Sequence, residues 1–454
     1  MTAISFNVSN REFSLFKSLT TAQTIRNFMS IMAMLLLALT GGLTLSSCGQ
    51  EDEPIHQDFP PVPQRVINLS ALKAADLPDS TLTLYNGYTL TGTLNGEEEK
   101  IKIQIAHGAT ITLSDAHING YHSNNTPWAG ITCLGDATII LVGDNSVSPF
   151  RNIFPCIQPG YNDTGEGEEY TLTIRGDGSL IVAPDMNCPT AIGCGYSSNC
   201  GNILIEGGTI TAIAQEAAIG TSRDSQCGDI TITGGTIMAQ SLSYGPGIGC
   251  GELSSCGNIT ITGGTVTAIG TSGSAGIGSG QAYSFTPSIC GNITITGGNV
   301  SAFGNNRAAG IGTGISSICG DISILGGIVT AQGGDNAAAI GCGIGSKERP
   351  TTCGNITFGS DIICVTAIKG YSAIMPIGFS SYDQNDNICG NITFGMKQAY
   401  TAGDDPLCGY DYWPIDLYFE EQTTDIGDMD DDFPDAYLNN TWVYFTESWF
   451  DYNP

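Results

Sequence analysis

Residues 256–280 read Cys-Gly-Asn-Ile-Thr-Ile-Thr-Gly-Gly-Thr-Val-Thr-Ala-Ile-Gly-Thr-Ser-Gly-Ser-Ala-Gly-Ile-Gly-Ser-Gly and form one unit of a repeat. The opening Cys-Gly-Asn/Asp recurs with its cysteine at Cys200, Cys227, Cys256, Cys290, Cys319, Cys353 and Cys389. A Gly-Ile-Gly-like close recurs around Ile192, Ile219, Ile248, Ile277, Ile311, Ile340 and Ile377. Because self-similarity at a period of about 30 residues is the signature of stacked repeats, the sequence predicts a solenoid.

Within the quoted unit, aliphatic side chains alternate with threonines in two short runs. Ile259 and Ile261 do so before a Gly-Gly pair, and Val266 and Ala268 do so after it. This period of two predicts two half-buried strands joined by a turn. A third run around Ile277 adds one more inward side chain, so we expect three faces per coil. The sequence therefore predicts a parallel β-helix, in which a coil needs stacked neighbours in order to fold.

The composition of the whole chain agrees with an all-β fold. Of the 454 residues, 61 are glycine and 13% are charged, and no helix-forming run follows the first fifty positions. Acidic residues outnumber basic ones 44 to 15. Because nucleic acids and anionic lipid surfaces bind through lysine and arginine patches, this balance argues against nucleic acid as a partner.

The first 47 residues have the pattern of an export signal. Basic residues precede an apolar run from Ile31 to Leu39, which is too short for a comfortable membrane span. Leu45-Ser46-Ser47-Cys48 then resembles a bacterial lipobox. The resemblance implies cleavage before Cys48, diacylation of that cysteine and a lipid anchor in the membrane. The alternative is a plain secretory peptide followed by an incidental cysteine.

Residues 48–66 predict a tether. They are acidic and rich in proline, as expected for a solvated, extended segment. Gly49-Gln50-Glu51-Asp52-Glu53 resembles the acidic export signal that follows the lipidated cysteine in surface lipoproteins of Bacteroidetes-type bacteria. This resemblance implies an outer-membrane location with exposure at the cell surface. The alternative is that the acids only solvate the tether.

Residues 67–396 predict the β-helix itself, with irregular coils to about residue 199 and regular Cys-Gly-Asn coils over 200–396. The Gly-Gly-Thr-Val-Thr-Ala and Ala-Gly-Ile-Gly repeats resemble the right-handed parallel β-helix proteins of bacterial surfaces that are often labelled carbohydrate-binding. The resemblance covers roughly residues 100–396. It implies a single right-handed solenoid, which at this repeat length holds about ten coils, and a glycan-binding or adhesive function.

Residues 397–454 differ in composition from the coils. They are rich in aromatic residues and aspartate and contain no basic residue after Lys397. We expect this segment to cap the last coil, with its tryptophans buried, because an open solenoid end exposes apolar side chains and strand edges. The alternative is that Trp413, Trp442 and Trp449 are exposed and stack on sugar rings.

Five acids within the C-terminal segment are a candidate calcium site, since Ca²⁺ prefers several carboxylate oxygens. These are Asp425, Asp428, Asp430, Asp431 and Asp432. They lack the glycine-centred spacing of an EF-hand, so the alternative is a solvated acidic loop. No other cofactor is expected.

The repeated cysteines and asparagines predict two ladders along the solenoid. Cysteines at one position of successive coils would lie about 4.8 Å apart, which allows disulfides between neighbouring coils or a row of buried thiols. The residue after each Cys-Gly pair should place its side chain against the next coil and hydrogen-bond to it. This second ladder comprises Asn202, Asp229, Asn258, Asn292, Asp321, Asn355 and Asn391.

Insertions are confined to one corner of the coil. From the isoleucine of the close to the next cysteine, the spacing is 8 residues at four places but 13, 13 and 12 after Ile277, Ile340 and Ile377. Because insertions on one edge of a repeat protein often form its binding face, these three rim loops predict a ligand site. Their aromatic and charged residues are Tyr283, Phe285, Lys347, Glu348, Arg349, Tyr382 and Asp383. The alternative is drift in loop length, which costs little.

Catalysis has little support in the sequence. The regular coils place Thr, Ser and Gly at outward strand positions, so no set of carboxylates converges for lyase or glycosidase chemistry. The sequence therefore predicts a non-catalytic lipoprotein that binds a glycan or surface polysaccharide or mediates adhesion. The alternatives are a structural spacer or stalk that contacts proteins and, third, a polysaccharide lyase or glycoside hydrolase with its site in the irregular coils.

Overall fold

The computed structural model describes residues 65–121, 126–161, 169–182, 188–283, 286–373, 375–380 and 387–394, and the backbone of 399–401, 413–415 and 441–445. In these ranges the chain forms mostly stacked parallel strands, with three short 3-10 helices between the first two strands, at Leu69–Ala71, Ala74–Asp76 and Pro78–Ser80. None of the helices in these ranges is long and apolar enough to cross a membrane.

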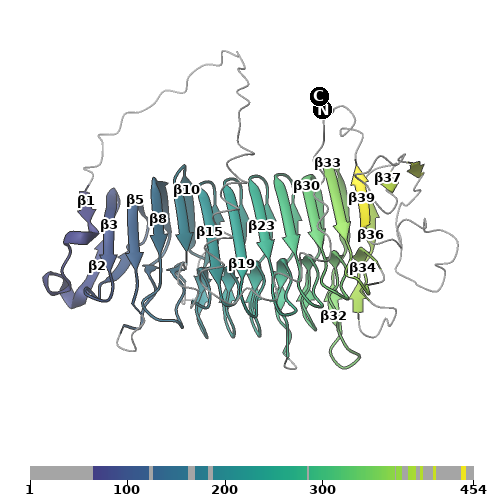
Figure 1. Cartoon of the computed structure of the whole chain (residues 1–454), viewed down its shortest axis with the longest axis horizontal. Helices are drawn as coiled ribbons and strands as arrows, with labels where there is room; N and C mark the ends of the chain where they lie inside the picture. The colour runs from purple at the N-terminus through teal and green to yellow at the C-terminus, as the bar shows by residue number, and fades with distance from the viewer. Residues whose placement is uncertain are drawn as a thin grey trace, which may run out of the picture. The chain divides into compact units, whose positions relative to one another are not determined.

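The strands of successive coils form four ladders, of which sheet A holds two and sheets B and C hold one each. Figure 1 shows the stack of coils with its long axis horizontal. Sheet A has 19 strands: β1 (Arg65–Asn68), β3 (Tyr88–Asn95), β5 (Ala109–Asn119), β7 (Ala137–Val142), β8 (Asp144–Val147), β10 (Thr171–Gly176), β11 (Ser179–Val182), β14 (Asn202–Ile205), β15 (Thr209–Ala214), β18 (Ile230–Ile232), β19 (Thr236–Ser241), β22 (Ile259–Ile261), β23 (Thr265–Ile269), β26 (Ile293–Ile295), β27 (Asn299–Phe303), β30 (Ile322–Gln332), β33 (Ile356–Ile368), β36 (Ile392–Phe394) and β39 (Thr441–Phe445).

Sheets B and C hold shorter strands. Sheet B has 11 strands: β2 (Thr81–Leu84), β4 (Lys102–Ile105), β6 (Ile131–Cys133), β9 (Ile157–Gln158), β12 (Ile192–Cys194), β16 (Ile219–Thr221), β20 (Ile248–Cys250), β24 (Ile277–Ser279), β28 (Ile311–Gly312), β31 (Ile340–Gly341) and β34 (Ile377–Gly378). Sheet C has 7 strands: β13 (Asn199–Cys200), β17 (Gln226–Cys227), β21 (Ser255–Cys256), β25 (Ile289–Cys290), β29 (Ile318–Cys319), β32 (Thr351–Cys353) and β35 (Asn387–Cys389).

The pairing confirms the predicted parallel β-helix. Each strand of the repeat pairs in parallel with its equivalent one coil later, for example Ile230 with Ile259 and Ile248 with Ile277. Sheet B contributes one strand per coil, so its 11 strands correspond to 11 coils, where about ten were predicted. Strand β10 pairs with both β7 and β14, which joins the irregular and regular coils without a break.

One detail of the predicted coil was wrong. Three faces were expected, from the runs around Ile259, Val266 and Ile277. Instead, the ladder cysteines form short strands of their own in sheet C, so Cys227 pairs with Cys256 in parallel register. The extra ladder arises because Cys-Gly-Asn turns the chain between β21 and β22, so that the two residues of β21 before the corner form a strand separate from β22.

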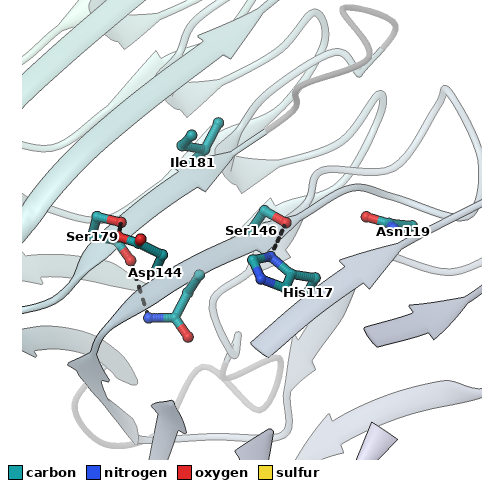
Figure 2. Close-up of a pocket in the computed structure, with 7 residues that line it drawn as sticks. His117, Asn119, Asp144, Ser146, Ser179 and Ile181 are labelled. Carbon is teal, nitrogen blue, oxygen red and sulfur yellow. Dashed lines mark hydrogen bonds between the residues drawn. The ribbon is translucent and has the colours of Figure 1, made fainter. Parts of the chain in front are cut away.

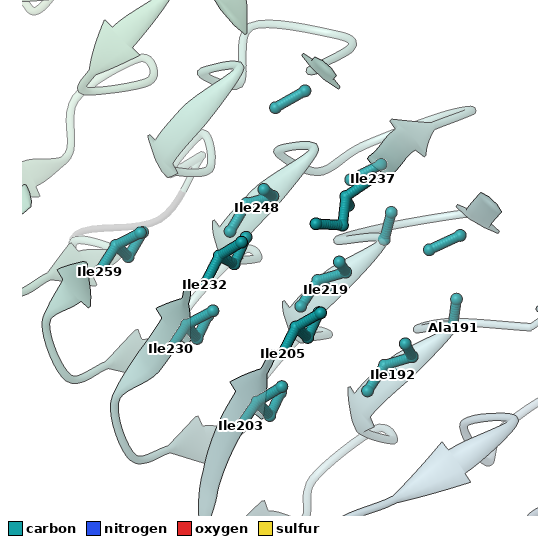
Figure 3. Close-up of a cluster of buried hydrophobic side chains, with 14 of the residues drawn as sticks. Ala191, Ile192, Ile203, Ile205, Ile219, Ile230, Ile232, Ile237, Ile248 and Ile259 are labelled. Carbon is teal, nitrogen blue, oxygen red and sulfur yellow. The ribbon is translucent and has the colours of Figure 1, made fainter. Parts of the chain in front are cut away.

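The core consists of the inward aliphatic side chains that the alternation predicted. Ile259, Ile261, Val266, Ala268 and Ile277 are all 0% exposed. Figure 3 shows how isoleucines of successive coils form rows in the interior, on strands of sheets A and B. Burying each such side chain contributes roughly 1.5–3 kcal/mol, and every coil adds to one continuous core.

The glycine that follows each isoleucine of sheet B packs against the next coil at very short range. Gly249 has a φ of +136°, and a Cβ built there would overlap the carbonyl oxygen of Gly278 in the next coil. Gly220 and Gly278 show the same clash with Gly249 and Gly312, respectively. The Gly-Ile-Gly repeat is therefore required by close backbone packing as well as by the positive φ.

The asparagine ladder is confirmed, and its donors explain why aspartate replaces asparagine in two coils. Each Oδ1 accepts a hydrogen bond from the backbone N–H of the next residue in the ladder. For example, the Asn258 N–H donates to Asp229 Oδ1 at 2.6 Å, and the Asn292 N–H donates to Asn258 Oδ1 at 3.0 Å. Because the donor is a backbone group, only an acceptor oxygen is needed. Asp229 and Asp321 provide it as well as asparagine does.

The cysteine ladder is a row of buried thiols rather than a chain of disulfides between coils. Cys227, Cys256 and Cys290 are among its free, buried members. Cys200 is the exception: it is bridged to Cys194 in its own coil, with the two Cα atoms 5.6 Å apart.

The C-terminal segment contributes one strand to sheet A. Strand β39 pairs antiparallel with the second half of β33, and Trp442 lies opposite Ala367. Strands β37 (Ala399–Thr401) and β38 (Trp413–Ile415) pair with each other. Strand β39 thereby covers part of the edge of sheet A, and capping of the last coil by the whole segment stays a prediction. The side chains of Trp413 and Trp442, and Trp449 altogether, lie outside the described residues, so their burial stays a prediction.

Candidate functional site

The outer face of sheet A changes character in the early coils. Strand pairing aligns His117, Ser146, Ile181 and Thr211 in one outward column across β5, β8, β11 and β15. A second column starts with Asp144 and Ser179 and continues as threonines in the regular coils, at Thr209, Thr236 and Thr265. The early coils therefore carry an imidazole and a carboxylate in columns that hold uncharged side chains in the regular coils, including Met238, Asn299 and Ile328.

These side chains line a cleft of about 770 Å³. Its lining residues are His117, Asn119, Asp144, Asn145, Ser146, Ser179 and Ile181. Figure 2 shows His117 and Asp144 on neighbouring strands, with Ile181 further along the face. Ile181 is 36% exposed, so it offers an apolar contact beside the polar groups.

Two hydrogen bonds between coils hold the polar groups of the cleft. His117 Nδ1 lies 3.0 Å from Ser146 Oγ, and Ser179 Oγ donates to Asp144 Oδ1 at 2.8 Å. Both pairs are drawn with dashed lines in Figure 2. Because each serine is itself anchored in a strand, the imidazole and the carboxylate are held in place before any ligand binds.

Asn145 forms the floor of the cleft and ties three strands together. It is buried, its Oδ1 accepts from the Ala116 N–H of β5 at 3.0 Å, and its Nδ2 donates to the Ser179 carbonyl of β11 at 3.0 Å. Asp144 is fixed at its backbone as well, since its N–H donates to Asp115 Oδ1 at 3.0 Å. A buried, satisfied amide makes this part of the sheet rigid.

The predicted rim loops are brought together in part. Arg349 lies in a tight turn closed by reciprocal backbone hydrogen bonds with Ser346. Its guanidinium donates to the carbonyl oxygens of Tyr283 at 2.6 Å and of Ala282 at 3.3 Å, which joins two rim loops that are 66 residues apart in sequence. Arg349 is thus engaged in holding the rim together, whereas the Tyr283 side chain is 62% exposed.

The other predicted site residues are placed as follows. Lys347 and Glu348 are exposed in the same turn as Arg349. Phe285, Tyr382, Asp383, Cys48 and the acids Asp425, Asp428, Asp430, Asp431 and Asp432 lie outside the described residues. Within the described ranges, no three His, Cys, Asp or Glu side chains are arranged to hold a metal ion. The rim and calcium hypotheses therefore stay predictions.

A buried acid was not predicted from the sequence. Glu216, in the turn after β15, is 6% exposed, and its Oε2 has no hydrogen-bond partner. Burial raises the pKa of Glu216 to about 7, although the Tyr196 hydroxyl and the Arg223 backbone N–H both bond to the carboxylate. Beside it, Arg223 Nε lies 3.7 Å from Glu252 Oε2. In sequence, Gln215-Glu216 resembles an ordinary polar loop, so nothing indicated this burial.

The cleft was also missed, but a signal for it existed. His117 and Asp144 occupy outward positions of strands in the irregular coils, where the regular coils have uncharged side chains, most often threonine. Finding them required the strand register of coils that lack the cysteine marker. Another acid of the strands, Glu206, has its Oε2 4.0 Å from Arg175 Nη1 on the neighbouring coil.

Comparison with known proteins supports the architecture. A family model described as a beta helix repeat matches residues 230–252, 259–281, 293–315 and 322–344. Each match begins at the first isoleucine after a Cys-Gly-Asn/Asp turn and extends past the Gly-Ile-Gly close. Together with the stacked parallel sheets, these matches identify a parallel β-helix repeat protein. No curated protein and no solved structure matches the chain.

Proposed function

We propose that this parallel β-helix protein is a non-catalytic glycan-binding protein and that the cleft on β5, β8 and β11 holds the sugar. The observation that carries the proposal is a fixed imidazole and carboxylate beside Ile181, in a cleft of about 770 Å³, at positions where the regular coils hold uncharged side chains. Small-ligand sites generally combine an apolar surface with a few oriented polar groups.

The chemistry of the lining suits a neutral sugar. Asp144 offers two carboxylate oxygens to vicinal hydroxyls, and His117, Asn119 and Ser146 offer further donors and acceptors. Anionic polymers are disfavoured because the chain has a formal net charge of -29. A glycosidase requires two carboxyl groups across the scissile bond, whereas Asp144 is the one acid among the lining residues, which supports binding without cleavage.

The test is binding of the purified chain to an array of neutral and acidic glycans, followed by titration of each ligand found. Substituting His117→Ala or Asp144→Ala is expected to weaken binding, by about tenfold or more for Asp144→Ala, because a hydrogen bond to a charged group contributes about 1.5–3 kcal/mol. The matched control is Thr267→Ala, which removes an outward side chain from the His117 column in a regular coil and should leave affinity unchanged.

Each alternative function has its own outcome in this experiment. Undiminished affinity in both cleft variants, together with loss of binding when the rim loops are cut to the 8-residue form, would move the site to the rim. New reducing ends or unsaturated products on incubation with polysaccharides would establish an enzyme. Binding of the purified chain to proteins but to no glycan would favour a spacer or stalk.

We also propose that Cys48 carries a lipid that anchors the protein in the outer membrane with the β-helix outside the cell. The support is the Leu45-Ser46-Ser47-Cys48 pattern and the acidic residues that follow it. Cys48→Ala is expected to abolish incorporation of labelled fatty acid and to release the protein from the membrane fraction. Unchanged labelling in that variant would refute the anchor, and Cys408→Ala is the control.

A further inference from the structure

Three coils carry a second cysteine across the corner from the cysteine ladder. Cys194, Cys250 and Cys342 each follow the sheet B isoleucine of their coil by two residues, and each precedes the sheet C cysteine of the same coil. In the intervening coils this position is occupied by hydroxyl residues instead, namely Thr221, Ser279 and Thr313. The paired thiols therefore occur at one corner, between sheets B and C.

The first of these pairs is already bridged. Cys194 and Cys200 form a disulfide across 6 residues, with the Cα atoms 5.6 Å apart. The second pair, Cys250 and Cys256, has the same spacing. Strand register also aligns them: Cys194 pairs with Thr221 and Thr221 with Cys250, while Cys200 pairs with Cys227 and Cys227 with Cys256. The second pair therefore occupies the same positions as the first pair, two coils further along the solenoid.

The third pair shows the same placement through a shared contact. Cys194 Sγ lies 3.0 Å from the carbonyl oxygen of Gln226, the residue before the ladder cysteine of the next coil. Cys342 Sγ lies 3.5 Å from the carbonyl oxygen of Ile388, which precedes Cys389 in the same way. Cys342 therefore occupies the position of Cys194, and its thiol interacts with those of Cys353 in its own coil and Cys389 in the next.

We propose that Cys250–Cys256 and Cys342–Cys353 close as disulfides when the chain folds in an oxidising compartment, as Cys194–Cys200 does. In each step two thiols lose two protons and two electrons, one S–S bond forms, and a disulfide of an exported thiol–disulfide oxidoreductase is reduced to a dithiol. The proposal rests on export of the chain and is independent of glycan binding.

Burial determines when these bonds can form. All four cysteines are buried, and burial raises the pKa of the Cys250 thiol well above its usual value. Because the thiolate is the species that attacks a disulfide, oxidation should be slow once the coils have closed and should occur during folding. A chain folded under reducing conditions is therefore expected to keep these thiols when it is later exposed to oxidant.

The third bond would have a consequence for the rim. Residues 343–352 form the enlarged loop between Cys342 and Cys353, and they include Lys347 and Arg349. A disulfide at the base of this loop would restrict the loop's conformations in the unfolded chain and fix its two ends in the folded one. It would thereby hold the turn whose Arg349 reaches the loop of Tyr283.

The test is disulfide mapping of the full chain, exported or refolded with a disulfide oxidant and then alkylated under denaturing, non-reducing conditions. The sequence offers a cleavage site inside every pair: Tyr196 and Leu253 for chymotrypsin, and Lys347 for trypsin. We expect three linked peptide pairs that separate on reduction, with Cys194–Cys200 as the internal standard. Alkylation of Cys250 and Cys342, or links from Cys256 or Cys353 along the ladder, would overturn the proposal.

Variants give a second readout. Cys250→Ser should make Cys256 fully alkylatable while the other two links remain. The matched control is Cys227→Ser, because the residue across the corner from this ladder cysteine is Thr221. It should leave all three links intact. If Cys250→Ser instead leaves Cys256 protected from alkylation, Cys256 is paired with another cysteine and the proposed partner is wrong.

Discussion

Replacing Gly249 with alanine is expected to lower the free energy of unfolding by about 4 kcal/mol or more, a loss at the upper end for single substitutions. Two effects combine. The φ of +136° is strained for any residue with a Cβ, and that Cβ would overlap the Gly278 carbonyl of the next coil. Because the overlap is with backbone, relief requires neighbouring coils to separate, which also weakens their parallel pairing.

Urea unfolding followed by circular dichroism measures this loss, and Gly108→Ala provides the matched control. Gly108 also has a positive φ, +73°, but nothing lies within 4 Å of a Cβ built there. The free energy of unfolding of Gly108→Ala should therefore fall only by the cost of the left-handed conformation, about 1–2 kcal/mol. Equal losses at the two glycines would mean that conformation alone, rather than the approach of adjacent coils, explains the Gly-Ile-Gly repeat.

The repeat made most of the fold predictable because identical residues must occupy identical places. Successive residues of a strand point to opposite faces, so Ile259 and Ile261 point inward while Thr260 points outward. The same alternation returns in the regular coils. The Asn258 ladder followed from one turn residue repeated at a fixed position. Where the pattern was local and periodic, sequence and structure agree.

The candidate site was not predictable in the same way, since it depends on register between coils that do not resemble each other. His117 meets Ser146 because β5 pairs with β8 after an irregularity: Ser114 pairs with Val142, whereas His117 pairs with Ser146. No spacing rule read from the regular coils gives that one-residue shift. The location of the rim was predictable, because insertions mark it. That Arg349 joins two rim loops could not be inferred from the sequence, because its partner lies 66 residues away.

The largest effect of pH on folding is expected from Glu216. Its pKa is about 7 in the folded chain and 4.5 in the absence of burial. The folded state therefore holds this proton more tightly than the unfolded state, so stability is greatest below pH 4.5, falls as pH rises to about 7, and is constant above. A shift of this size corresponds to about 3 kcal/mol, since one pKa unit is about 1.4 kcal/mol.

Glu216→Gln isolates this contribution from the other acids of the chain. The amide is uncharged and keeps an oxygen that can accept from the Tyr196 hydroxyl and the Arg223 N–H, so it resembles the protonated acid. Urea unfolding should give similar stabilities for variant and wild type near pH 4.5 and a variant more stable by about 3 kcal/mol at pH 7.5. The neighbouring Gln215→Ala changes no titratable group and should follow the wild-type slope. Parallel curves for wild type and Glu216→Gln would mean that the carboxylate is ionised in the folded protein across this range, with its charge balanced by Arg223 rather than suppressed by burial.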